Sequence, residues 1–160
     1  MRRLLIVTAA ALMAVTTPAW AGLTLSTDHR AISFGLMQLG EEKALAEAGS
    51  FHNEITVSST NGQTWYLKIS LLQPLTFGSE TIPLEAFSWQ LATTTGNGTV
   101  VTPFQARPFS LTPELVYISG PNEAGGTNVR FQLKYLLKIP EAQARGLYQT
   151  TIRVTLAEIL

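Results

Sequence analysis

The chain has 160 residues, of which 46% are hydrophobic and only 14% are charged, with equal numbers of acidic and basic side chains. This composition is typical of an ordered globular protein, and it gives no basis for a nucleic-acid partner or a polyionic tail. The sequence contains no cysteine, which excludes disulfides, a cysteine nucleophile and a cysteine-ligated metal site.

Residues 1–21 have the organisation of a cleaved signal peptide. Arg2 and Arg3 precede an apolar run of 12 residues, and Ala19 and Ala21 are small residues where signal peptidase requires them. The run is too short for a membrane span, which needs about 20 residues, although a retained membrane anchor is the alternative. We expect cleavage after Ala21, export to the periplasm, cell surface or extracellular space, and one domain over residues 22–160. Loss of both arginines leaves nine basic residues against eleven acidic ones. The absence of disulfides favours a bacterial origin.

The first part of this domain is ambiguous. Residues 23–26 and 31–35 are short apolar pieces separated by charged residues, and they predict either one interrupted edge strand or a tail followed by a first strand. Residues 41–48 are good helix formers, but eight residues make a marginal helix on their own. We expect two helical turns or an irregular loop there.

Alternating apolar residues then predict two strands, over residues 51–60 and 64–70. Asn61-Gly62 between them indicates a hairpin turn. If the two strands pair, a three-residue loop with Gly62 in the left-handed conformation keeps Val57 opposite Trp65, so that both point to the same face.

The middle of the chain predicts shorter pieces. Residues 71–84 contain two prolines and a glycine and are expected to form a long connection. Phe87, Trp89 and Leu91 form another inward-facing set, and short strands are expected at residues 99–102 and 115–119.

The clearest pattern lies in the C-terminal third. Residues 129–139 and 148–156 alternate between apolar and mostly polar side chains, as long half-buried strands do. The connection from Pro140 to Gly146 predicts one helical turn ending in a left-handed glycine, which suits a crossing between two sheets. Tyr148 then occupies the place of the corner tyrosine of immunoglobulin-like sandwiches, whose hydroxyl bonds to upstream backbone.

These elements predict an all-β fold, an immunoglobulin-like antiparallel β-sandwich of seven or eight strands. On that mapping the two long strands are the fifth and sixth, and no seventh follows before Leu160. Two alternatives stay open: the sandwich lacks its closing strand, or extra strands earlier in the chain close it.

The sequence gives no constellation for catalysis. His29 and His52 have no triad partner or nucleophile elbow, and we expect both to be solvated surface residues. No metal-ligand spacing, phosphate-binding glycine loop or selected carboxylate pair is present, so no cofactor is expected. Tyr66, Phe77 and Tyr117 could be exposed and form a sugar-stacking platform, although aromatic residues in sandwiches more often pack inside.

Two segments, Ile32-Ser-Phe-Gly35 and the run from Gly146 to Leu156, resemble the secreted spore-coat-protein-U-type β-sandwich subunits. That group includes the archaic chaperone–usher pilins, in which an early strand ends in Phe-Gly and the last strand opens with Gly-x-Tyr. The resemblance implies an incomplete sandwich whose missing strand comes first from a chaperone and later from a neighbouring subunit.

Two features depart from this family. Its pilins usually carry a cysteine pair, and this chain has none. They also carry an N-terminal donor segment, whereas here only residues 22–30 precede Ile32, and Leu23 and Leu25 would make a short donor. A subunit that only accepts a strand, and a self-complete surface domain, are both compatible with these departures.

We therefore expect a non-enzymatic structural subunit of a surface fibre, pilus or coat, assembled by β-strand addition. The expected edge is the last strand, with inward residues Tyr148, Thr150, Ile152, Val154 and Leu156. Expected partners are subunits of the same or a related type, together with a periplasmic chaperone and an outer-membrane usher. The alternative is an exported carbohydrate- or ligand-binding module. An exported enzyme has no supporting residues.

Overall fold

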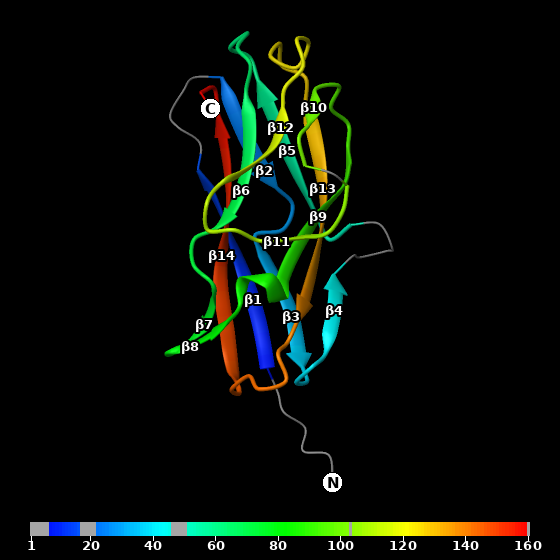
Figure 1. The fold of residues 1–160 in the computed structure, drawn as a ribbon. Helices are drawn as coiled ribbons and strands as arrows, with labels where there is room; N and C mark the ends of the chain where they lie inside the picture. Colours follow the sequence, from blue (N-terminus) through cyan, green and yellow to red (C-terminus); the bar gives the residue numbers. More distant parts are fainter. Residues whose placement is uncertain (1–6, 17–21, 46–50, 103, 160) are drawn as a thin grey trace.

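In a computed structural model, described for residues 7–16, 22–45, 51–102 and 104–159, the chain forms two packed β-sheets (Figure 1). The predicted β-sandwich is confirmed. The described residues form short strands in addition to the seven or eight expected. Within these ranges no helix is long and apolar enough to cross a membrane.

The first sheet contains the last strand of the chain. Its hydrogen-bonded order is β10 (Thr99–Val100), β12 (Glu114–Ile118), β6 (Tyr66–Leu71), β14 (Gly146–Ala157), β1 (Val7–Thr16) and β3 (Ala31–Met37). A small hairpin, β7 (Leu75–Phe77) with β8 (Glu80–Ile82), is attached to β14 within the connection expected at residues 71–84.

The second sheet is organised around the other long strand. Its order is β11 (Arg107–Pro108), β9 (Phe87–Thr94), β13 (Val129–Lys138), β5 (Asn53–Ser59) and β2 (Leu23–Thr27). β4 (Glu42–Leu45) also pairs with β13, beyond the part of β13 that β5 covers. A single 3-10 turn, η1 (Leu84–Ala86), leads into β9.

The core forms where the inner faces of the two sheets meet. Every second residue of β13 and β14 is buried, as the alternation predicts, because successive side chains of a strand point to opposite faces. The inward set of the middle region is also confirmed: Phe87, Trp89 and Leu91 are at most 1% exposed.

The expected hairpin between residues 51–60 and 64–70 is wrong. β5 pairs with β13 and β2, whereas β6 pairs with β14 and β12, so the loop between them crosses from one sheet to the other. Gly62 is left-handed as expected, with φ at +69°. The alternation fixed which side chains face the core, but it could not say which strand lies beside which.

The expectations for two connections are also wrong: the two helical turns or irregular loop at residues 41–48, and the single helical turn before β14. Residues 42–45 form β4, since the end of β13 beyond β5 offers free backbone groups that outweigh the weak preference of a short helix; residues 46–48 lie outside the described part. The connection before β14 is a turn without helix, and Gly146 is not left-handed as predicted but begins the strand. Glycine is needed there for close approach, because a Cβ at Gly146 would lie 2.1 Å from Cδ1 of Phe77.

The corner tyrosine is confirmed. The Tyr148 hydroxyl donates to the carbonyl of Ala144 at 2.9 Å and accepts from Nε2 of Gln143 at 2.8 Å. As expected, this connection carries the chain from the second sheet into the first.

The ambiguous start of the domain is an interrupted strand that changes sheets. β2 lies at the edge of the second sheet and β3 at the edge of the first. Asp28 fixes the change: its Oδ1 accepts from the backbone N–H of Glu54 at 2.7 Å, and its own N–H donates to the Glu54 carbonyl. The chain then leaves the second sheet and continues as β3.

Candidate functional site

The position beside the last strand is the candidate site, and β1 fills it. β1 lies between β14 and β3, as Figure 1 shows. It runs parallel to β14 from Val7 beside Gly146 to Thr16 beside Thr155, and antiparallel to β3. The parallel pair departs from the antiparallel sandwich that the sequence predicts. β1 is part of the segment that the sequence predicts to be removed. The predicted cleavage site itself lies outside the described residues.

β3 depends on β1 for its place in the sheet. In the part of the chain that the structure describes, β3 is the terminal strand of the first sheet and pairs with β1 alone. Gly35, with φ at +65°, allows a bulge at which the register shifts between Ala9 and Ala10 of β1. The extra residue at the bulge shifts the alternation along β3 by one position, so that Phe34 and Met37, three residues apart, are both buried. Without β1, a gap one strand wide would separate β3 from β14.

The inward face of β1 completes the core with two alanines and a methionine. Ala9 and Ala11 are at most 2% exposed and Met13 is 6% exposed. Leu12, on the opposite face, is 57% exposed. We call the space that these three inward side chains occupy, between β14 and β3, the strand groove.

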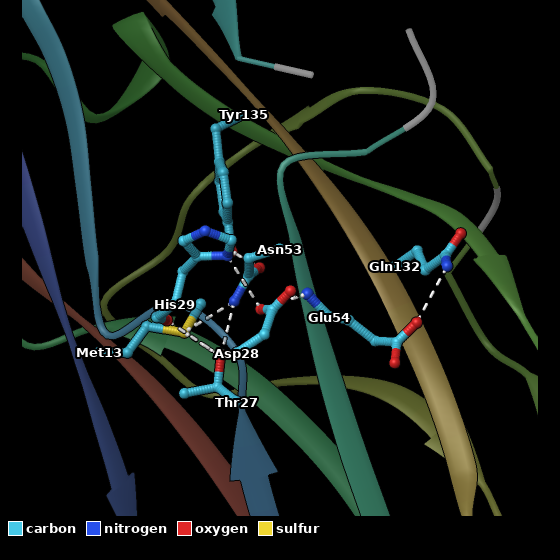
Figure 2. A network of polar contacts seen from close by, with 8 residues as sticks. All are labelled: Met13, Thr27, Asp28, His29, Asn53, Glu54, Gln132 and Tyr135. Carbon is cyan, nitrogen blue, oxygen red and sulfur yellow. Dashed lines mark hydrogen bonds and ion pairs between the residues drawn. The ribbon is translucent and has the colours of Figure 1, made fainter. Parts of the chain in front are cut away.

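The strand groove ends in a buried polar group. Asn53 is fully buried, and its Nδ2 donates to the sulfur of Met13 at 3.3 Å and to Oγ1 of Thr27 at 2.8 Å. Its Oδ1 accepts from the hydroxyl of Tyr135 at 2.7 Å. Figure 2 shows Asn53 between Tyr135 on one side and the Met13 and Thr27 side chains on the other.

The neighbouring groups fix the orientation of this amide. The Thr27 hydroxyl donates its proton to the carbonyl of His29 at 3.0 Å, so towards Asn53 it can only accept. Burial, and to a lesser extent the negative charge of Asp28, raise the pKa of Tyr135 well above its ordinary value. The phenol is therefore neutral and donates. Both hydrogens of the Asn53 amide consequently point to Thr27 and Met13.

The residues expected to form an addition edge all lie inward on β14. Tyr148, Thr150, Ile152, Val154 and Leu156 are at most 4% exposed, and their strand pairs with β6 on one side and β1 on the other. The segment considered as a donor is used within the chain, where Leu23 and Leu25 of β2 lie beside Ser59 and Val57 of β5.

The aromatic residues considered for ligand stacking are not equivalent. Tyr117 is fully buried, contrary to the exposure considered for it, and Tyr66 is half-buried. Phe77 is 45% exposed and packs its ring 5.9 Å from that of Tyr148. These positions do not provide three exposed rings.

Both histidines were expected to be solvated; His29 is, and His52 is not. The side chain of His29 is 42% exposed and lies 3.2 Å from the carboxylate of Asp28. His52 is 8% exposed rather than solvated, with its ring 5.9 Å from that of Tyr135. Its ring also lies 5.5 Å from that of His29, so two neighbouring rings pack against it.

Two residues that the sequence did not single out, Asn53 and Glu123, lie in buried polar clusters. Asn53 alternates with Ile55 and Val57 along β5 and therefore points to the core with them. A polar residue at such an inward position is the sequence signal that could have identified it. Glu123 is 3% exposed although it lies in a loop. Its carboxylate accepts from the Tyr117 hydroxyl at 2.7 Å and from the backbone N–H groups of Asn97 and Gly120 at 2.5 and 2.7 Å.

The Glu123 cluster ties loops together. Burial, followed by the hydrogen bond to Glu123, raises the pKa of Tyr117, which keeps the phenol protonated and donating. The Tyr117 oxygen in turn accepts from the N–H of Gly98 at 2.5 Å. Every polar group named here has a partner within the fold, as a structural cluster requires.

The described residues contain no group of three or more metal-binding side chains. No family model matches the chain, and no curated protein matches it. The geometry shows one strand, β1, packed between β14 and β3, with two apolar contacts at Ala9 and Ala11 and one polar contact at Met13.

Proposed function

We propose that this chain is an exported, non-enzymatic structural subunit of a surface fibre, pilus or coat, and that it assembles by accepting a β-strand from another protein. One observation carries the proposal: the strand beside β14 comes from the segment that the sequence marks as a leader. If the leader is removed after Ala21, the strand groove opens between β14 and β3.

An added strand would cover the groups that such a groove exposes. Removal of β1 uncovers apolar side chains on β14 and β3 and leaves unpaired backbone groups on both. An extended segment satisfies both needs at once, since its backbone pairs with the two strands and its alternate side chains enter the core. The proposed partners are subunits of the same or a related type, with a periplasmic chaperone and an outer-membrane usher acting before assembly.

A carbohydrate-binding function is less well supported. It relied on exposed aromatic rings, and of the three considered Tyr117 is buried and Phe77 packs beside Tyr148. The strand groove is therefore the site on which the proposal rests.

A complementation experiment tests the proposal. Residues 22–160 are refolded with and without a peptide of the β1 sequence, VTAAALMAVT, carrying a terminal lysine tag for solubility. We expect the chain alone to give oligomers or to melt at low temperature, and the peptide to give a soluble 1:1 complex with a melting temperature at least about 10 °C higher.

A scrambled peptide of the same composition is the control, because it keeps hydrophobicity but loses the alternation. A stable monomer of residues 22–160 whose melting temperature does not respond to the β1 peptide would contradict the proposed function.

A further inference from the structure

We infer that the strand groove selects its partner by a side-chain pattern: two small residues at alternate positions, followed two residues later by a long side chain that accepts a hydrogen bond. This inference rests on the proposed function. The occupant is an extended segment of a partner protein with this pattern, for which Ala9, Ala11 and Met13 mark the three positions.

The two small positions are set by packing. Ala9 lies beside Tyr148 of β14 and Gly35 of β3, and Ala11 lies beside Thr150 and Ile32. Both alanines are almost completely buried. A larger residue at either position would have to displace packed core side chains, which destabilises well-packed interiors.

The residue type at the third position, that of Met13, is determined by a buried hydrogen-bond donor, the side-chain amide of Asn53. Asn53 has three hydrogen bonds in the structure, and one of them goes to the sulfur of Met13. When β1 is absent, one N–H of this buried amide loses its partner, and an apolar incoming side chain would cover it without replacing the bond. Leaving a buried donor unpaired is costly, so the groove discriminates against such a strand.

The third position also has room for a longer side chain. A cavity of about 320 Å³ lies against Met13 and is lined by residues of β2 and by Arg30. A thioether, or the amide carbonyl of glutamine, can therefore reach Asn53 while the rest of the side chain borders this open space. The opposite, outward face of the strand, represented by Leu12, carries no such requirement.

The pattern also argues against this chain's own start as the donor. A strand made of residues 23–27 would place Leu23 and Leu25 at the two alanine positions in the same register. Its Thr27 would accept a hydrogen bond but is shorter than methionine. This narrows the partners proposed above: we assign the occupant to a related but different protein rather than to a second copy of this chain.

The test varies the third position in two formats. In the full chain, retained with its first 21 residues, Met13→Leu should lower the melting temperature more than Met13→Gln, with Leu12→Gln as the outward control that changes it little. In trans, residues 22–160 are refolded with β1 peptides carrying methionine, glutamine or leucine at this position, and with a peptide of residues 22–27. We expect the leucine peptide to bind about 5–10-fold more weakly than the other two β1 peptides.

The outcomes separate the two proposals. Equal binding of the methionine, glutamine and leucine peptides, or equal melting of the two Met13 variants, overturns the inference and leaves the proposed function standing. Binding of the 22–27 peptide as tightly as the β1 peptide overturns the assignment to a different protein. Failure of every peptide to bind overturns the proposed function, and the inference with it.

Discussion

Ala11→Asp in the full chain should abolish the stabilisation that β1 provides. Ala11 is 2% exposed between two strands of the core, so the substitution places an unpaired carboxylate in an apolar position. We expect a loss of about 3–5 kcal/mol of unfolding free energy, limited by the free energy of inserting β1 itself. The uncleaved variant is refolded and its mass is verified. Its free energy of unfolding is then compared with that of the wild type by chemical denaturation.

Leu12→Asp is the matched control for this variant. It introduces the same charge one residue away, on the face where the side chain is 57% exposed, and should change stability by no more than about 0.5 kcal/mol. If the two variants are equally stable, β1 does not occupy the strand groove in the uncleaved chain.

Glu123→Ala should have the second-largest effect, because it removes an acceptor shared by one buried hydroxyl and two part-buried backbone N–H groups. The Tyr117 hydroxyl and the N–H groups of Asn97 and Gly120 would all lose their partner. We expect a loss of about 3 kcal/mol in denaturant unfolding. Glu141→Ala, at an exposed position in another loop, is the control and should be close to neutral. Equal stability of the two variants would contradict a structural role for Glu123.

Much of the fold could be predicted from local sequence patterns. The inward faces of β13 and β14, the corner tyrosine and the sheet crossing before β14 all follow from local patterns, and the structure confirms them. Strand neighbours could not be predicted in this way. Val57 of β5 and Leu67 of β6 both face the core, but from opposite sheets, and the periodicity of each strand is the same whether or not the two strands pair.

The site was predicted only in part. The sequence predicted a free edge at the last strand, because no closing strand follows it, whereas β14 is paired on both sides, by β6 and by β1. The polar end of the groove depends on tertiary contacts: Asn53, Thr27 and Met13 come from three strands, and no local motif links them. Residues 42–45 show the same limit, since the free end of β13 decides their conformation.

Hydrogen exchange of β3 tests the central claim most directly. β3 is joined to the first sheet through β1, whereas β13 is paired on both sides within the domain. In residues 22–160 refolded alone, the amides of β3 should exchange rapidly, and the β1 peptide should slow them while those of β13 remain slow throughout. Amides of β3 that are equally protected with and without the peptide would contradict the account.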